Sequence, residues 1–329
     1  MSAPPDLDLL VLGDCNPDLV LVDAQLVPEF GQAERLIERA ELTIGGSGAI
    51  MACGAARLGL KTALAAVIGD DLFGHFMAES LREREVETPG VVVEPTLQTG
   101  VTVILARPDD RAILTFPGAI EALRSELVDP ELLARARHVH VSAFFLQRSL
   151  APGLGELLAS VQARGGSTSL DPNWDPSGEW DGGLRDVLGE VDVLLPNAVE
   201  VCAIAGCEEP VEAAKRLADA GPLVVVKMGG DGALAVRAGE EPVVARAPNV
   251  PAGVDAVGAG DSFDAGFLAG RLSGSTVGEA LALACACGTL SMRAAGGTGG
   301  QATRAEAEAL ARSARAGAEA SSAPAPHSR

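Results

Sequence analysis

The chain of 329 residues contains no tyrosine, and aromatic residues make up only 3% of it. Because 47% of the residues are still hydrophobic, the core must be built mainly from Ala, Val and Leu. Small aliphatic side chains suit helices that pack closely on a parallel sheet. The composition therefore favours an α/β protein, long enough for one large domain or two ordinary ones.

Positive charge is scarce as well. Lys and Arg number 25 against 45 Asp and Glu, which gives a formal net charge of -20. This charge would repel phosphate backbones and anionic lipid surfaces, so we expect no nucleic-acid partner and no membrane partner. A small anionic ligand would need local positive potential from a helix N-terminus, a bound metal or a single lysine.

Long apolar runs are missing too. The first residues, MSAPPDLDLLVLGDCN, contain no basic segment followed by a long apolar one, and no run of about 18 uncharged apolar residues follows. We therefore predict a cytoplasmic protein. The six cysteines form no CxxC pair, which predicts small buried thiols and not a disulfide framework or a zinc site. His138 and His140 flank Val139 without nearby carboxylates, so we expect strand residues and not metal ligands.

Short apolar runs alternate with segments of helical spacing through most of the chain. Runs near residues 7–14, 136–145, 167–173, 191–197 and 222–230 read as strands, and 153–165, 182–191 and 210–221 read as helices. This alternation predicts right-handed βαβ units and a parallel sheet. Ligands bind at the carboxyl ends of such strands, so the polar residues there should meet in one crevice. These residues are Asp14, Ser142, Asp171, Asn197 and Lys227.

Two segments break this rhythm. Residues 33–46 and 97–119 look like strands with a hairpin, in which ARPDDRA supplies a Pro-Asp turn. They predict a small β lid over the crevice. Residues 311–329 are rich in Ala, Ser and Pro without an apolar face, which predicts a disordered tail.

The stretch DAVGAGDSFDAGFLAG, residues 255–270, holds the strongest local pattern. Gly258 and Gly260 allow a tight turn whose amides can point into one space, and Asp261 lies in the first turn of the next helix. Amides at a helix N-terminus form an anion site. Alternatively, Asp261 is only an N-cap with Asp264 as a partner resembling a capping box. The stretch alone leaves both interpretations open.

Five segments in fixed order favour the first interpretation. They are GGSGAIMACGAARLG at 45–59, VIGDDLFGHFMAESL at 67–81, LLPNAVEVCAIAG at 194–206, KMGGDGALAV at 227–236 and the 255–270 stretch. Together they resemble the ribokinase-like (PfkB) carbohydrate kinase family over nearly all of the chain. The resemblance implies one kinase domain over 1–310, a mostly parallel central sheet flanked by helices, and a β lid over about 18–44 and 96–118. The family uses no GxxxxGK[ST] loop, and this chain has none.

The resemblance also implies an activity: ATP-dependent phosphorylation of a hydroxyl group on a sugar or sugar-like molecule. The amides of Ala259, Gly260 and Asp261, in the turn that Gly258 begins, would hold the transferring phosphoryl group. Asp261 would contact the acceptor and act as general base, taking the hydroxyl proton as that oxygen attacks the γ-phosphorus.

Nucleotide and metal positions follow from the same resemblance. Asn197 and Glu200 match an NxxE motif that organises Mg²⁺, here through water; the alternative is a strand end and a favourable charge at a helix start. Asp255 and Val257 match positions whose carbonyls bind a monovalent cation in many members, which makes K⁺ a candidate cofactor. The nucleotide-binding positions are Asn197, Lys227, Gly229, Gly230, Gly232, Gly258 and Gly260, although a tight β-turn alone would explain the loop glycines.

The acceptor side matches less completely. Asn16 and Asp18 match an NxD motif that binds sugar hydroxyls, although Asp18 also suits a turn after Pro17. Gly45 and Gly46 match paired glycines that let the sugar lie against the backbone.

This chain departs from the family at four acceptor positions. Ile50 stands where members with GGxxxN place an Asn against the sugar, so one hydrogen-bonding group is lost. Ser47 stands where ribokinase has Lys, and Phe144, with Phe145, stands where it has Glu, which predicts a more apolar substrate wall. Asp175 replaces an Arg of related kinases, which argues against an anionic sugar acid as acceptor.

Two other functions stay open at this stage. One is a nucleoside kinase with the same machinery, and the other is a noncatalytic sugar- or nucleotide-binding protein of the same fold. A dinucleotide oxidoreductase is set aside because no GxGxxG opens a helix after the first strand. Relatives often dimerise through their lids, which would cover exposed strand edges, so we predict a homodimer.

Overall fold

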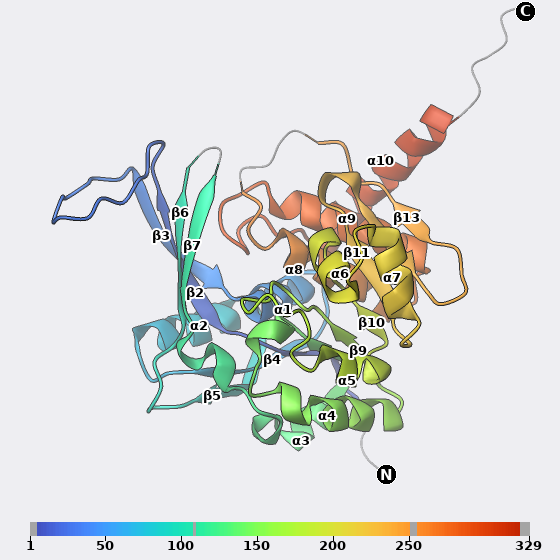
Figure 1. The fold of residues 1–329 in the computed structure, drawn as a ribbon, viewed down its shortest axis with the longest axis horizontal. Helices are drawn as coiled ribbons and strands as arrows, with labels where there is room; N and C mark the ends of the chain where they lie inside the picture. The colour runs from blue at the N-terminus through green and yellow to red at the C-terminus, as the bar shows by residue number, and fades with distance from the viewer. Residues whose placement is uncertain (1–4, 108–109, 251–254, 323–329) are drawn as a thin grey trace, which may run out of the picture.

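The computed structural model describes residues 5–107, 110–250 and 255–322. Its large sheet has the strand order β13-β12-β11-β10-β9-β8-β1-β4-β5 (Figure 1). Pairs from β11 to β5 are parallel, and β12 and β13 add antiparallel strands at one edge. The predicted α/β fold is confirmed. The strands are β1 (Leu7–Leu12), β4 (Thr62–Ile68), β5 (Glu87–Val93), β8 (Ala136–Val141), β9 (Ser167–Leu170), β10 (Val193–Leu194), β11 (Leu223–Lys227), β12 (Ala233–Val236) and β13 (Val243–Ala245).

A second sheet of four strands projects to one side of the molecule (Figure 1). It contains β2 (Asn16–Val22), β3 (Arg39–Gly45), β6 (Val101–Ala106) and β7 (Arg111–Phe116), in the order β3-β2-β6-β7. β2 and β6 are parallel, whereas β2–β3 and β6–β7 are antiparallel. We call this sheet the lid sheet. The predicted hairpin is β6–β7, and part of its turn, residues 108–109, lies outside the described residues.

Helices cover both faces of the large sheet, and each face has its own core. Successive residues of a strand point to opposite faces. Leu9 and Val11 of β1 therefore join one hydrophobic cluster, and Leu10 and Leu12 join the other. The helices are α1 (Ser47–Arg57), α2 (Leu72–Glu83), α3 (Pro130–Arg135), α4 (Ala151–Ala163), α5 (Leu184–Val187), α6 (Ala198–Ala205), α7 (Pro210–Ala218), α8 (Ala259–Leu272), α9 (Val277–Ser291) and α10 (Arg304–Ser322).

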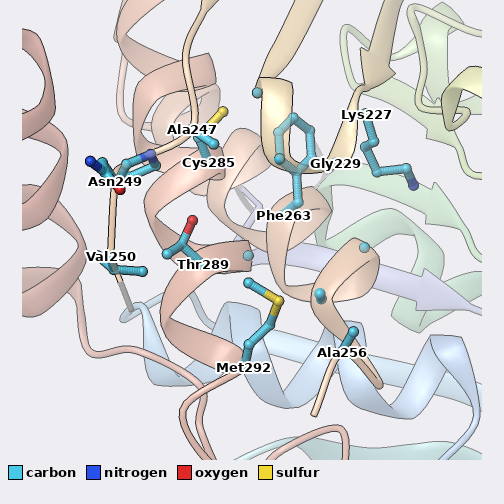
Figure 2. A pocket seen from close by; sticks show the side chains of 16 residues that line it. Lys227, Gly229, Ala247, Asn249, Val250, Ala256, Phe263, Cys285, Thr289 and Met292 are labelled. Atoms are coloured by element: carbon cyan, nitrogen blue, oxygen red, sulfur yellow. The ribbon is translucent and has the colours of Figure 1, made fainter. Parts of the chain in front are cut away.

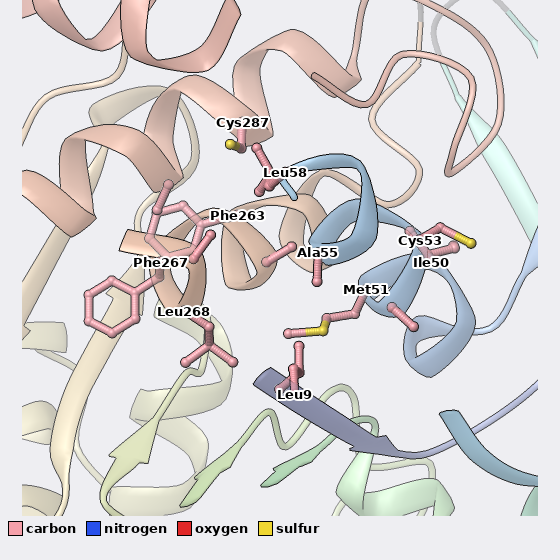
Figure 3. Close-up of a cluster of buried hydrophobic side chains, with 14 of the residues drawn as sticks. Leu9, Ile50, Met51, Cys53, Ala55, Leu58, Phe263, Phe267, Leu268 and Cys287 are labelled. Carbon is pink, nitrogen blue, oxygen red and sulfur yellow. The ribbon is translucent and has the colours of Figure 1, made fainter. Parts of the chain in front are cut away.

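Helix α8 lies at the centre of the first cluster (Figure 3). Its Phe267 is fully buried. Glycines bring α8 close to α9: a Cβ at Gly266 would lie 2.8 Å from Cys287 Sγ, and one at Gly270 would lie 3.0 Å from Ala280 Cα. Larger residues at these two positions would push the helices apart.

Three further predictions can be compared with the structure. Cys15, Cys53, Cys285 and Cys287 are buried free thiols, whereas Cys202 and Cys207 are half-buried. The structure differs at the tail, because α10 continues to Ser322 and Ala311 packs in the core; residues 323–329 lie outside the described residues. In the described part of the chain, no helix has the length and apolar character needed to cross a membrane.

The two predicted strand histidines are confirmed on β8. Both are buried and lie within 2.7 Å of the Ser169 hydroxyl, through His138 Nε2 and His140 Nδ1. Burial lowers the pKa of His138 to about 3 and that of His140 to about 4. Both imidazoles therefore stay neutral at physiological pH.

Candidate active site

The polar residues predicted at the strand ends do meet at the carboxyl edge of the large sheet. Asp171, after β9, accepts an ion-pair contact of 3.0 Å from Lys227 at the end of β11. Asn197 forms a β-bridge with Lys227. Ser142 donates its N–H to Leu12 O at 2.9 Å, next to the loop that holds Asp14. The predicted crevice is therefore at the expected edge.

Helix α8 begins in this crevice with two amides that no described residue accepts from. The N-cap is Gly258, with a φ of 70° and no side-chain cap. The N–H of Ala259 donates to Ala256 O at 3.3 Å, whereas the N–H groups of Gly260 and Asp261 have no acceptor among the described residues. Two amides are thus free to bind an anion, where three were predicted.

Gly258 cannot be replaced without strain. A Cβ there would lie 2.7 Å from Gly297 Cα and 2.9 Å from Ile50 Cγ2, and its φ lies in the left-handed region. This glycine therefore shapes the turn that presents the two amides.

Asp261 faces the crevice from the first turn of α8. Burial raises the pKa of this carboxyl well above its usual range, and the negative charges of Asp171 and Asp14 add to the shift. Lys227 and a hydrogen bond from Ser47 oppose it. A carboxylate with raised proton affinity is a stronger general base.

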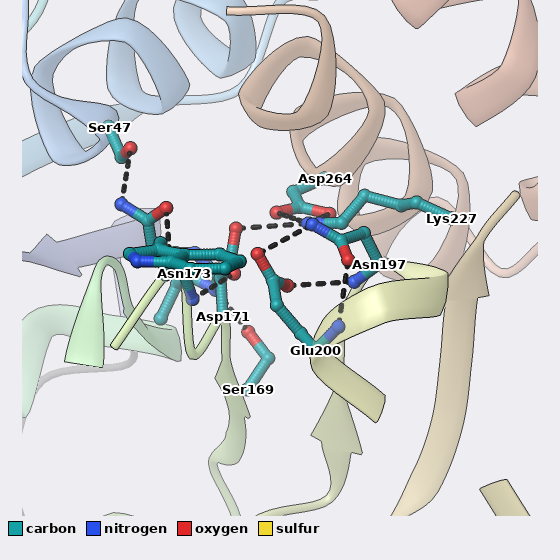
Figure 4. A network of polar contacts seen from close by, with 10 residues as sticks. Ser47, Ser169, Asp171, Asn173, Asn197, Glu200, Lys227 and Asp264 are labelled. Carbon is teal, nitrogen blue, oxygen red and sulfur yellow. Dashed lines mark hydrogen bonds and ion pairs between the residues drawn. The ribbon is translucent and has the colours of Figure 1, made fainter. Parts of the chain in front are cut away.

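Lys227 is fixed between two carboxylates (Figure 4). Its Nζ lies 3.0 Å from Asp171 Oδ2 and 3.1 Å from Asp264 Oδ2, and its side chain is only 13% exposed. Asp264 is therefore an ion-pair partner of Lys227 and not a capping residue for Asp261, which corrects that alternative. Its position one helical turn after Asp261 was the only sequence sign of this role.

A cavity of about 590 Å³ opens beside Lys227 and the start of α8 (Figure 2). It brings together Lys227, Gly260 and the loop glycines Gly229, Gly230 and Gly232. The sequence did not identify its apolar wall, to which Phe263, Cys285 and Met292 contribute. A cavity of this size, with an apolar wall and glycines at its mouth, suits a nucleotide.

Asn197 and Glu200 form a capping box at the start of α6. Glu200 accepts from Asn197 N at 2.8 Å and from its Nδ2 at 2.6 Å. Burial raises the pKa of Glu200 to about 7, and Asp171 adds to the shift. Among the described residues, no cluster of three His, Cys, Asp or Glu side chains could hold a metal directly.

Asp255 connects the start of α8 to the lid sheet. Its carboxylate accepts from the N–H groups of Val257 and Gly296, each at 3.0 Å. Arg111 of β7 lies 3.4 Å from the same carboxylate. This contact between lid and body was not predicted from the sequence.

The acceptor positions gather at the base of the lid sheet. Asn16 and Gly45 are paired across β2 and β3. A Cβ at Gly45 would collide with the Asp18 carboxylate, and one at Gly46 would lie 2.9 Å from Asn16 Oδ1. The two glycines therefore make room for these side chains.

Two polar groups here are available for hydrogen bonding. The buried Asn16 Oδ1 has no hydrogen-bond partner among the described residues. Burial raises the pKa of Asp18 to about 7, with repulsion from Asp14 and Asp255 adding to the shift. Both groups suit the hydroxyl donors of a sugar.

Three other predicted features lie differently around the acceptor side. Ser47 accepts from Asn173 Nδ2 at 3.4 Å, at the start of α1 and next to Asp261. Phe144 is only 2% exposed and packs in the second core cluster, so it supports the crevice from behind where an apolar wall was predicted. Asp175 accepts from Trp180 N and Ser177 N, which organises its own loop. Trp174 is the exposed aromatic of this segment.

Comparisons with known proteins agree with this geometry. Residues 6–304 match the model of the pfkB family carbohydrate kinases. An ATP-dependent ribose-1-phosphate kinase of Halopiger xanaduensis is 32% identical over 86% of this chain and 91% of that protein. A fructokinase of Klebsiella pneumoniae is 30% identical over 77% of this chain and 86% of its own length. The solved ribokinase of Thermotoga maritima has a TM-score of 0.78 at 25% identity and covers 93% of this chain and 99% of that one. The fold is therefore ribokinase-like, and the chain belongs to the pfkB family of carbohydrate kinases.

Proposed function

We propose that this protein transfers the γ-phosphoryl group of ATP to a hydroxyl group of a sugar or sugar-like small molecule. One observation supports the proposal above all: Asp261 lies at the free amides of α8, beside the cavity that Gly260 lines. Base, anion site and nucleotide cavity thus meet at one helix start.

The chain's residues suggest how transfer proceeds. Asn16 and Asp18 bind hydroxyls of the acceptor and hold one of them near Asp261. Asp261 takes the proton of that hydroxyl while its oxygen forms a bond to the γ-phosphorus and the bond to the β-phosphate oxygen breaks. The N–H groups of Gly260 and Asp261 bind the transferring oxygens, and ADP leaves.

Magnesium fits this site through water. Asn197 Oδ1 accepts hydrogen bonds from two amides of α6, and the Glu200 carboxylate accepts one from the N–H of Asn197. Direct ligation of the metal by either side chain would therefore break the capping box. Glu200 and Asn197 would instead hold the waters of Mg²⁺, and the bound ion would offset the charge of the triphosphate. K⁺ at the Asp255 and Val257 carbonyls stays a prediction; the side-chain carboxylate of Asp255 accepts hydrogen bonds from two backbone amides instead.

The acceptor that the site suits best is uncharged. The negative charges of Asp14 and Asp255 both act on Asp18, and Arg111 of the lid sheet is already paired with Asp255. An acceptor with a carboxylate or phosphate would meet this negative charge. We therefore expect neutral sugars to be phosphorylated in preference to sugar acids and sugar phosphates.

We also propose a homodimer through the lid sheet and a location in the cytoplasm, where ATP is available. Strand β7 lies at an edge of the lid sheet and is exposed along its whole length. Ile113, Leu114 and Phe116 are 53%, 61% and 47% exposed, which is unusual for large apolar side chains on an edge strand. Leu114→Arg should reduce the mass found by light scattering to that of one chain; an unchanged mass would exclude β7 from the interface.

The test of the activity is a screen of ADP production with neutral hexoses, pentoses, nucleosides, sugar acids and sugar phosphates. Asp261→Asn should lower kcat by about 10²–10⁴-fold while ADP still binds. The noncatalytic alternative predicts no ADP production with any acceptor. The nucleoside alternative predicts that nucleosides outrank all sugars.

A further inference from the structure

The chain has three lysines, and one of them is buried in the crevice. Lys61 and Lys215 are exposed, whereas Lys227 is inserted between Asp171 and Asp264. A Cβ at Gly260 would lie 3.8 Å from Lys227 Nζ. The ammonium group is therefore next to one of the two free amides of α8, and it also lines the nucleotide cavity.

Two carboxylates from different elements determine where this ammonium lies. Asp171 follows β9 and contacts Nζ at 3.0 Å, and Asp264 of α8 contacts it at 3.1 Å and 3.3 Å through its two oxygens. Asp264 is only 1% exposed. A long lysine side chain has several rotamers, and losing either contact would free it to move.

We propose that Asp264 is a positioning residue for phosphoryl transfer: with Asp171 it fixes the Lys227 ammonium beside Gly260, where the ammonium meets the transferring phosphoryl group. This inference rests on the proposed kinase function. It assigns Asp264 a task that neither a helix cap nor a simple ion pair requires.

The protonation of the three groups agrees with this assignment. Burial tends to raise the pKa of Asp171, but Lys227 and hydrogen bonds lower it below its usual value. Burial raises the pKa of Asp264 well above its usual range, although Lys227 opposes the shift. Lys227 thus favours the ionised form of both carboxyls, which ties each of them to the ammonium that they hold.

Asp261 should respond to any displacement of Lys227. The charged groups that influence its pKa are Asp171, Lys227 and Asp14, of which Lys227 alone favours the ionised form; the Asp264 carboxyl also interacts with that of Asp261. Glu200 and the neutral His140 also interact with the Asp171–Lys227 pair. Moving the ammonium away would therefore increase the proton affinity of Asp261.

The test compares Asp264→Ala and Asp264→Asn with the wild type. Asp264→Ala should lower kcat by about 10²-fold, as expected for a misplaced catalytic group, and raise the pKa of the acid limb of kcat/KM by about half a unit or more. It should weaken the binding of a nonhydrolysable ATP analogue more than the binding of ADP, because ADP lacks the γ-phosphoryl group that Lys227 would contact. Asp264→Asn, which keeps a contact to Nζ, should lose several-fold less activity.

A matched control is Glu87→Gln, which breaks the 3.1 Å pair with Arg135 at the amino end of β5. It should shift neither the acid limb nor the ratio of the two nucleotide affinities. If Asp264→Ala does not fold, Asp264→Ser, whose side chain is one bond shorter than the carboxylate, replaces it in every measurement. An unshifted acid limb with equal loss of ADP and analogue binding would overturn the inference. A wild type inactive toward every acceptor would instead overturn the proposed function.

Discussion

Polar groups are paired with one another at the carboxyl edge of the large sheet, whereas on the lid sheet they are not. At the edge, Lys227, Asp171 and Asp264 are buried and joined within 3.3 Å. On the lid sheet, Asp18 has no ion-pair partner among the described residues, and every residue of β7 is exposed. Under the proposed function, the groups for phosphoryl transfer are held by contacts within the body, whereas the groups for acceptor binding lack such contacts among the described residues.

The largest expected difference between the two regions is in stability. Phe267→Ala in α8 should lower the free energy of unfolding by about 3–5 kcal/mol, because it empties a fully buried site. Ile113→Ala on β7, a residue 53% exposed, should change it by less than about 0.5 kcal/mol. Urea unfolding of both variants at low protein concentration measures this. Similar losses would mean that the lid sheet is packed as tightly as the body.

Two glycines with positive φ sharpen the comparison. Gly258→Ala in the body would meet Gly297 and Ile50, and its φ is 70°. We expect a loss of about 2 kcal/mol or more and a kcat reduced by about 10²-fold, because the free amides move. Gly31 lies beside the lid strands, with a φ of 98° and open space around it. Gly31→Ala should lower the free energy of unfolding by about 1–2 kcal/mol through backbone strain, and its catalytic rate should equal that of the wild type. Thermal unfolding and initial rates test both variants.

The raised pKa of Asp18 predicts how the stability of the fold depends on pH. Its folded pKa is raised to about 7 from an ordinary 3.8, so the folded state binds the proton more tightly and its stability falls as pH rises between these values. Asp18→Asn removes that penalty and should raise the Tm at pH 8 but not near pH 4. Acceptor KM should rise about tenfold to a hundredfold, the value of a hydrogen bond to a charged group. A Tm gain of equal size at both pH values would contradict the raised pKa.

The smallest effect is expected where lid and body meet. Arg111→Ala removes the 3.4 Å ion pair with Asp255. The side chain of Arg111 is 40% exposed and that of Asp255 is 19% exposed. Such a pair contributes about 0–1 kcal/mol and is screened by salt. The free energy of unfolding should therefore change little, and any difference should vanish at high salt. A loss that persists in 1 M salt would show that Arg111 holds the lid sheet by more than charge.

The sequence predicted much of the body of this fold, because there the spacing of apolar residues and the place of polar residues at strand ends are enough to locate the elements. Apolar runs predicted five of the nine described strands of the large sheet, β1 and β8 to β11. The residues Asp171, Asn197 and Lys227 at the ends of three of these runs predicted the edge where they meet. The GAGD motif placed Asp261 at a helix start next to two free amides. Each of these predictions depends on neighbours in the chain or on the geometry of a parallel sheet.

The remaining features depend on distant side chains. The pairing of Asp264 with Lys227 joins residues 37 positions apart, and no local pattern separates it from a capping role. Phe144 follows a strand end, as a substrate wall would, yet it packs in the core against Phe145, whose ring in turn contacts Trp180. Helix α10 lacks an obvious apolar face, so Ala311 gave no sign of its burial.

The glycine contacts between α8 and α9 have a consequence for engineering. Gly270 lies nine residues after Asp261, about 13 Å along a straight helix that moves as one rod. A methyl group added at Gly270, 3.0 Å from Ala280, would tilt or slide that rod and displace its far end. Catalytic rate should therefore be tunable from this interface without touching the crevice.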